Sequence, residues 1–246
     1  MPPAPGWNEG PYASVAAPPI TSDPPDHHWH RRLILPIFSP QSVAKYEQGT
    51  KDLCNSLIDE FIDKGIADAA GDYAQHIPVR VIATMLGVPL EMEEEFTSWV
   101  RGVLEQGMTD PELRAASSRK IISFFAEQLA DRRKNPREGD FISELTQAEV
   151  EGQKVPDQYI LGVCNLMLVA GVDTTWSAIG STLWHLAQHP EHRQQLRDNP
   201  EMWPTAIEEL LRVYAPVTMA RIVDRDTEFQ GCPMKAGDRV LMTFPA

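Results

Sequence analysis

An acid and two hydroxyl groups lie in the middle of a long apolar stretch, in the segment Ala170-Gly171-Val172-Asp173-Thr174-Thr175. On a helix, Ala170, Asp173 and Thr174 share one face because they stand at positions i, i+3 and i+4. A carboxylate buried without a partner in an apolar wall costs several kcal/mol, so the position of Asp173 calls for a function. An acid beside a hydroxyl is suited to proton transfer.

Two further features shape the same helical turn. Gly171 has no side chain, which allows another group to approach the helix backbone closely. The hydroxyl of Thr174 is predicted to donate to the carbonyl of Ala170, four residues back, and to bend the helix. The segment therefore predicts a small polar notch. For these residues alone the alternative is close packing in a buried helix, with the aspartate capping a second helix.

A basic pair follows Pro24-Pro25-Asp26 near the start of the chain. His27 and Arg31 stand four residues apart, so a helix presents both on one face. Such a pair can hold a carboxylate through charge-assisted hydrogen bonds, and the planar guanidinium suits that geometry. A solvated basic face is the alternative. A metal site built from His27, His28 and His30 is not expected, because their spacing is poor.

Three more histidines, His185, His189 and His192, lie close together in the sequence. The first two are one helical turn apart, but the glutamate of a zinc-binding His-Glu-x-x-His helix is lacking. Pro190 is expected to break the helix before His192. Histidines near a helix C-terminus are favoured by the helix dipole without any ligand. We therefore expect no metal site at these residues.

Helical patterning dominates the elements that must position these candidates. Residues 1–25 contain eight prolines and are expected to be loose. A long helix is predicted over residues 156–189, where Pro190 stops it. Residues 222–243 alternate and contain two glycines, which predicts two short strands around turns. The other predicted helices cover residues 27–37, 41–64, 78–86, 90–106, 111–134, 140–145, 191–199 and 203–214.

With its flanks, the Ala170–Thr175 segment resembles the oxygen-binding helix of the cytochrome P450 haem monooxygenases, whose pattern is Ala/Gly-Gly-x-Asp/Glu-Thr-Thr/Ser. His27 and Arg31 match the His-x-x-x-Arg helix that grips a haem propionate in that family. The resemblance runs from about Asp23 to Leu241 and is nearest to soluble bacterial members of the camphor-hydroxylating type.

Two more motifs follow in the family's order. Glu209 and Arg212 match its Glu-x-x-Arg helix, where the pair belongs to a buried ion network; an ordinary surface pair is the default for such spacing. Residues 220–238 resemble the strand pair that follows, with Arg221 as its propionate-binding arginine. The resemblance implies a mainly α (α+β) cytochrome P450 fold, with a long central helix and a small β element at the C-terminal end.

The resemblance also implies a reaction and its cofactor. Heme b would be held by His27, Arg31 and Arg221, with Ala170, Gly171 and Thr174 beside it. Asp173 would relay protons toward bound O₂, which Thr174 would hydrogen-bond. One oxygen atom would enter a small hydrophobic organic substrate, with electrons from NAD(P)H delivered by a ferredoxin-type partner.

One family motif has no counterpart in the chain. The haem iron of the family is held by a cysteine thiolate in a Phe-x-x-Gly-x-x-x-Cys-x-Gly loop, and Cys54, Cys164 and Cys232 lie in other surroundings. We therefore expect the iron ligand outside this sequence, together with the N-terminal part of the fold. Residues 1–246 would then form a single incomplete domain, an internal fragment that is inactive by itself.

Composition excludes some classes of partner. A formal net charge of −13 argues against nucleic acid or an anionic membrane as partner. The apolar run over residues 161–172 is too short to span a bilayer. No secretory leader pattern is present, and three scattered cysteines indicate reduced thiols, so a cytoplasmic location is expected.

Two other functions compete with the monooxygenase interpretation. A catalytically inactive helical binding module could retain part of the fold, and haem content separates it from the enzyme. A lyase of the terpene-cyclase type would require an Asp-Asp-x-x-Asp cluster for magnesium. The acidic run at residues 93–95 does not have that pattern and is expected to be a solvated helix face.

Overall fold

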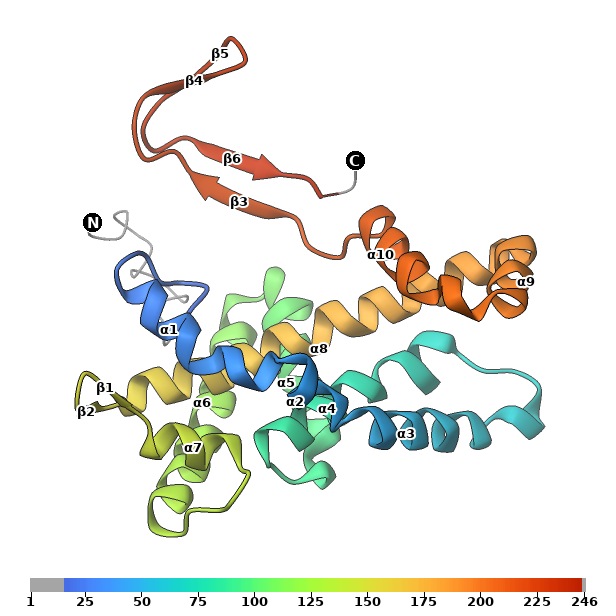
Figure 1. Cartoon of the computed structure of the whole chain (residues 1–246), viewed down its shortest axis with the longest axis horizontal. Helices are drawn as coiled ribbons and strands as arrows, with labels where there is room; N and C mark the ends of the chain where they lie inside the picture. Colours follow the sequence, from blue (N-terminus) through green and yellow to red (C-terminus); the bar gives the residue numbers. More distant parts are fainter. Residues whose placement is uncertain (1–15, 245–246) are drawn as a thin grey trace. The chain divides into compact units, whose positions relative to one another are not determined.

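Helices make up most of the structure, a computed structural model that describes residues 16–244 (Figure 1). The α-helices among these residues are α1 (Asp26–Ile34), α2 (Pro40–Ala44), α3 (Glu47–Asp59), α4 (His76–Leu86), α5 (Glu93–Leu104), α6 (Pro111–Lys134), α7 (Phe141–Gln147), α8 (Asp157–Gln188), α9 (Pro190–Asp198) and α10 (Trp203–Val213). The mainly helical fold with one long helix is thus confirmed. Residues 1–15, most of the segment expected to be loose, lie outside the described residues.

Prolines and caps set several helix ends where the sequence predicted them. The carboxylate of Asp110 caps α6, accepting from the backbone N–H groups of Glu112 and Leu113 at 3.1 and 3.0 Å. Pro111 then occupies the first turn, where its missing N–H is not needed. At the other end of the chain, α8 stops just before Pro190, which begins α9.

Six short strands form three antiparallel pairs among the described residues. They are β1 (Glu149–Val150), β2 (Gln153–Lys154), β3 (Met219–Ile222), β4 (Thr227–Phe229), β5 (Cys232–Met234) and β6 (Arg239–Met242). β3 pairs with β6, and β4 with β5 in a hairpin. Gln230 and Gly231, between β4 and β5, have φ of 48° and 81°, as a type I′ turn requires. The β element near the C-terminal end is confirmed; the small β1–β2 hairpin was not predicted.

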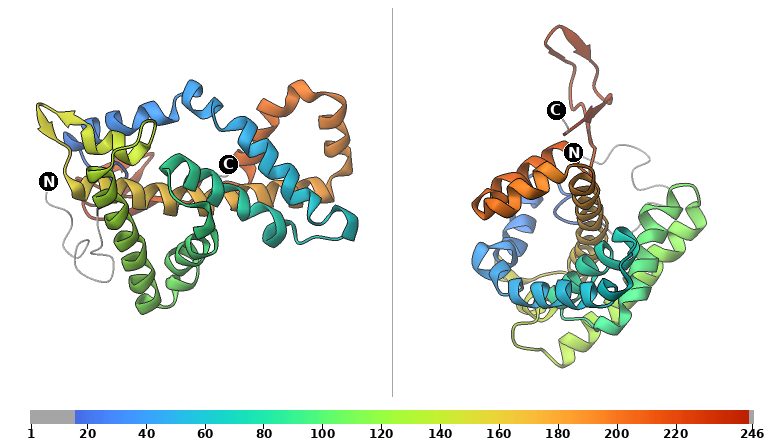
Figure 2. Two further views of the ribbon diagram at one scale, coloured as in Figure 1. Left: turned by 90° about the horizontal axis from the view of Figure 1, so that it is seen from below. Right: turned by 90° about the vertical axis from the view of Figure 1, so that its right-hand side faces the viewer.

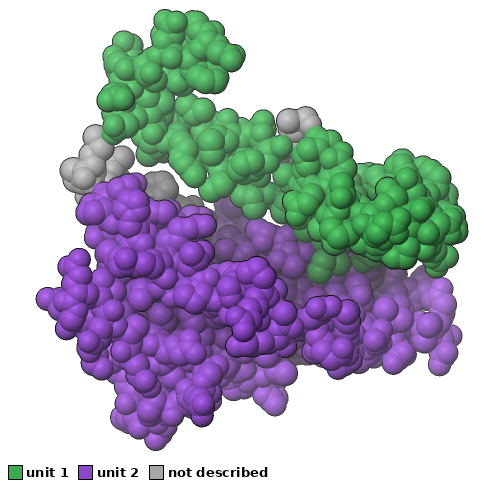
Figure 3. All heavy atoms as spheres, viewed as in Figure 1, with its two compact units in different colours: residues 1–4, 177–246 green, residues 5–176 purple. Residues whose placement is uncertain are grey.

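The chain divides into two compact units, whose described parts are residues 16–176 and 177–244 (Figure 3). The boundary falls inside α8, which contributes its first part to one unit and its last turns to the other. The two units are joined through this continuous helix. The single domain expected over the whole chain stays a prediction.

The hydrophobic core lies in the unit of residues 16–176. There α5 and α6 form a helical hairpin (Figure 2), and α4, α7 and the first half of α8 contribute further core side chains. Ile160, Val163 and Leu168 of α8 are completely buried. By length and composition the whole of α8 is able to cross a membrane, unlike the run of residues 161–172 alone. A core helix of a globular protein meets the same test, and the first half of α8 is packed in the core.

Part of the proline-rich segment packs on α8. Pro18 is buried, and a Cβ added at Gly162 would stand 2.7 Å from its ring. The backbone N–H of Thr21 donates to the carbonyl of Ala17, which closes a turn at 3.2 Å. Gly162 is therefore a contact point between α8 and the segment before α1.

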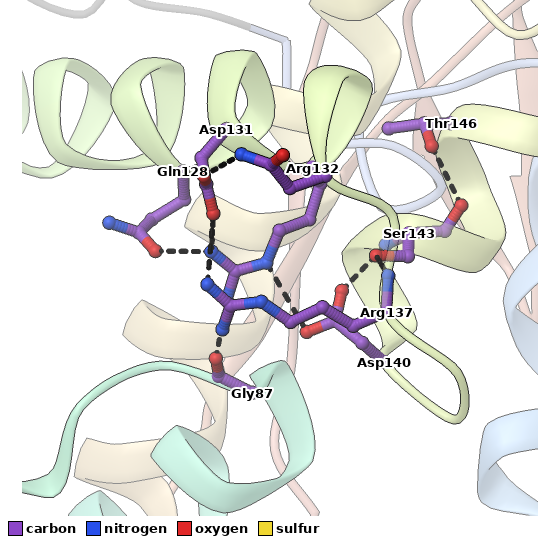
Figure 4. Close-up of polar contacts among 9 residues, drawn as sticks. Gly87, Gln128, Asp131, Arg132, Arg137, Asp140, Ser143 and Thr146 are labelled. Carbon is purple, nitrogen blue, oxygen red and sulfur yellow. Dashed lines mark hydrogen bonds and ion pairs between the residues drawn. The ribbon is translucent and has the colours of Figure 1, made fainter.

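A buried arginine joins the ends of three helices (Figure 4). Arg132, near the end of α6, is only 1% exposed and donates to the carbonyl of Gly87, just after α4, at 2.6 Å. Its Nε lies 3.5 Å from Oδ2 of Asp140, whose Oδ1 caps α7 by accepting from the N–H of Ser143 at 2.7 Å. Gly87 has φ of +66°, a conformation that glycine adopts without strain. The network fixes α4, α6 and α7 against one another.

Candidate functional site

The hydrogen bond predicted for the polar notch (Ala170, Asp173 and Thr174) is present in the middle of α8. The hydroxyl of Thr174 donates to the carbonyl oxygen of Ala170 at 2.8 Å, as its spacing predicted. Ala170 is exposed and Thr174 is half-buried, whereas Val172 on another side of the helix is completely buried. One face of α8 is therefore anchored in the core, while the face with the hydroxyl is left accessible.

The close approach expected at Gly171 is made by α4. A Cβ at this position would stand 2.6 Å from Cδ1 of Ile82, so the glycine allows that side chain to pack on the backbone of α8. Gly171 thus fixes α4 against the same turn that holds Thr174. Close packing was the alternative given for this segment, and the cofactor contact that the family resemblance implies for Gly171 stays a prediction.

Asp173 is half-buried beside the notch, and burial raises the pKa of its carboxyl group. A hydrogen bond with the side chain of Trp176 opposes this shift by favouring the ionised form. The guanidinium of Arg101, on α5, lies 5.6 Å from the centre of the Trp176 ring, within cation–π range. The carboxyl group is therefore held in an environment that brings its proton uptake closer to neutral pH.

The second pair of candidates lies on α1. His27 is half-buried and Arg31 is exposed, and neither side chain has a hydrogen bond or an ion pair with any other described residue. The helix itself is held to the start of α8: the hydroxyl of Tyr159 donates to the carbonyl of His30 at 2.7 Å, and the two rings stack at 4.8 Å. His27 and Arg31 are therefore available to donate hydrogen bonds to a ligand, and the contacts of Tyr159 fix the position of α1 within its unit.

The remaining candidates belong to residues 177–244. Arg221, on β3, is exposed and donates to the carbonyl of Ala220 at 3.0 Å. Arg212 binds Glu209 through two hydrogen bonds of 2.8 and 2.7 Å, and the two side chains are 47% and 59% exposed. Both side chains are exposed in this structure, and the buried ion network that the resemblance implies for the Glu-x-x-Arg motif stays a prediction.

Comparison with known proteins decides the family. The Cytochrome P450 family model matches residues 91–246. The chain belongs to the cytochrome P450 family. A probable cytochrome P450 127A1 of Sinorhizobium fredii is 35% identical over 90% of the chain, and the polyketide biosynthesis cytochrome P450 PksS of Bacillus subtilis is 31% identical over 91%. The chain spans 53% and 55% of these two relatives' own lengths, about half.

Solved P450 structures agree. The structure of PksS superposes with a TM-score of 0.84 at 30% identity, covering 95% of the chain and 58% of PksS. P450BioI, solved in complex with hexadec-9Z-enoic acid ligated acyl carrier protein, gives a TM-score of 0.88 at 25% identity over 98% of the chain and 63% of that protein. The P450 fold expected from the sequence motifs is confirmed.

The donor set suits the haem that the P450 family carries. A porphyrin has two carboxylates, and His27 and Arg31 offer donors that no described residue occupies. The three cysteines differ in how readily their thiols could ionise and bind iron. Cys164 is buried, and burial raises the pKa of its thiol, which disfavours the thiolate; Cys54 is half-buried and Cys232 is exposed.

Proposed function

We propose that this chain supplies the oxygen-side helix and the propionate anchors of a haem monooxygenase, which inserts one oxygen atom from O₂ into a small hydrophobic organic substrate. The observation that carries the proposal is the notch in α8, where the Thr174 hydroxyl is bonded to Ala170 at 2.8 Å beside a half-buried Asp173. The family supports haem monooxygenase chemistry in general.

Heme b, when bound, would supply the iron chemistry that activates O₂. The chain's own contribution at α8 is proton delivery. The raised pKa of Asp173 suits a carboxyl group that takes a proton from solvent and passes it on. Thr174 holds its hydroxyl on the accessible face of α8, bonded to the carbonyl of Ala170 at 2.8 Å, and would take part in this proton delivery.

The anchors would act through charge. His27 and Arg31 of α1 would bind one haem carboxylate, and Arg221 of β3 the other. Arginine forms two parallel hydrogen bonds with a carboxylate, which fixes orientation as well as position. The hydrogen bond from Tyr159 to α1 would keep this anchor in place relative to α8.

The proposal extends to partners and location. Electrons would come from NAD(P)H through a ferredoxin-type protein, and the enzyme would be cytoplasmic, with neither nucleic acid nor a membrane as partner. The net charge of −13 and the buried first half of α8 support the last point.

Haem binding by α1 variants tests the anchor directly. In the protein that contains this chain, we expect the His27→Ala and Arg31→Ala variants to bind haem more weakly in a Soret titration. His28→Ala and Arg32→Ala are matched controls, because both residues are exposed on the same helix. Equal haem affinity for the two sets would contradict the assignment of α1 as the propionate anchor.

A further inference from the structure

Three histidines and a glutamate come together where α8 ends and α9 begins. The imidazole rings of His185, His189 and His192 stack on one another, with centroids 4.4 to 5.2 Å apart. Nδ1 of His189 lies 3.1 Å from Oε1 of Glu191. Pro190 was expected to separate His192 from the other two, but the turn at the proline brings α9 back so that His192 faces the end of α8.

His189, Glu191 and His192 have the geometry of a ligand set. One potential ligand atom from each of the three lies within 4.8 Å of the other two. A tetrahedral zinc ion with bonds of about 2.0–2.1 Å holds its ligands about 3.3 Å apart, so small side-chain rotations close the site. Such rotations are open to His189 and Glu191, which are 43% and 63% exposed.

The neighbours of His192 orient it for a metal. Its Nδ1 lies 3.0 Å from Nε2 of His185, and Nδ1 of His185 lies 2.8 Å from the hydroxyl of Tyr214. In one arrangement of the protons, Nδ1 of His192 donates to His185, and Nδ1 of His185 donates to the hydroxyl of Tyr214. Nε2 of His192 then keeps its lone pair for a metal. Histidine ligands usually donate their other ring N–H to an acceptor, most often a carboxylate, a carbonyl or water, which fixes the tautomer; here Nε2 of His185 is the acceptor.

We propose that His189, Glu191 and His192 bind a divalent transition metal ion of the zinc class, with His185 and Tyr214 positioning His192. Two imidazoles and one carboxylate suit Zn²⁺ and leave a fourth position for water. None of these residues belongs to the notch in α8 or to the proposed haem anchors. A bound ion would link α8 to α9 across Pro190 and, through His185 and Tyr214, both of them to the end of α10.

Competition for Zn²⁺ with a chromophoric chelator tests the site. The probe is Zn²⁺ alone, added to the full 246-residue chain without a polyhistidine tag. We expect one ion per chain, no binding by His189→Ala/His192→Ala, and weaker binding by Glu191→Gln. Tyr214→Phe removes the hydroxyl that accepts from His185. It should weaken Zn²⁺ binding by roughly 10–100-fold, as the loss of groups that orient metal ligands typically does. His28→Ala, an exposed histidine on α1, should bind Zn²⁺ like the parent.

The conservative Glu191→Gln and Tyr214→Phe variants keep the test decisive if the double alanine variant fails to fold. Replacing Zn²⁺ by Co²⁺ adds a spectroscopic measure, since tetrahedral Co²⁺ with nitrogen ligands absorbs strongly in the visible range. The proposal is overturned if the parent binds no Zn²⁺, or if Glu191→Gln and the double variant retain the parent's affinity. Equal loss in His28→Ala would also overturn it.

Discussion

The Arg132→Ala variant should destabilise the chain far more than the loss of an exposed arginine does. Arg132 is 1% exposed and Asp140 8%, so the change leaves a buried carboxylate without its cation. The carbonyl of Gly87 also loses a donor at 2.6 Å. Breaking a buried ion pair by removing one partner typically costs about 3–5 kcal/mol, and we expect the free energy of unfolding to fall by that amount.

Urea unfolding followed by far-UV circular dichroism measures this loss. Arg137→Ala is the matched control: Arg132 and Arg137 both bind the carboxylate of Asp131 at 2.9 Å, but Arg137 is 53% exposed. An exposed pair contributes about 0–1 kcal/mol, so the control should unfold at nearly the parent's urea concentration. Equal losses in the two variants would show that the buried network does not hold the ends of α4, α6 and α7 together.

Three further predictions concern α8, its contact with α1, and the iron ligand. Burial raises the pKa of Asp173, so its contribution to stability is lost as pH rises from its unfolded value of about 3.9 through the raised folded value. Asp173→Asn should therefore melt at a higher temperature than the parent at neutral pH, with no such gain at more acidic pH; a pH-independent difference would contradict this cause. Tyr159→Phe, which loses the bond to His30, should lower the free energy of unfolding by about 0.5–1.5 kcal/mol in urea titrations, and an unchanged midpoint would show that this bond does not hold α1. The 246-residue chain, reduced under carbon monoxide with added haem, should lack the Soret band of thiolate ligation, because its cysteines lie outside the family's loop motif; a clear thiolate band would assign one of them to the iron.

Local spacing predicted those parts of the site that lie within one helical turn. The Thr174 hydroxyl and its acceptor Ala170 are four residues apart, so the helix alone brings them together. The start of α6 and the end of α8 were also predictable from nearby residues, since Pro111 and Pro190 restrict the backbone at their own positions. Such features need no knowledge of tertiary structure.

Contacts between elements were not predictable in this way. Arg132 meets Gly87 across 45 positions of sequence, and Arg101 reaches Trp176 from another helix. Nothing in the local pattern around either arginine differs from that of a surface residue. The histidine cluster was missed for a related reason: proline ends a helix, but the direction of the next helix depends on packing. β1 and β2 are two residues each, too short for alternation to appear.

The central claim is that the notch in α8 acts on oxygen in a haem monooxygenase. Its most direct test is the amount of product formed per NAD(P)H consumed by the haem-loaded protein that contains this chain. Thr175→Ala is the matched control, because Thr175 is the same residue type, adjacent and exposed. For Thr174→Ala we predict unchanged haem and substrate binding but a fall in coupling, with the electrons diverted to peroxide, while Thr175→Ala keeps the parent's coupling. Full coupling in Thr174→Ala would contradict the assignment of α8 as the oxygen-side helix.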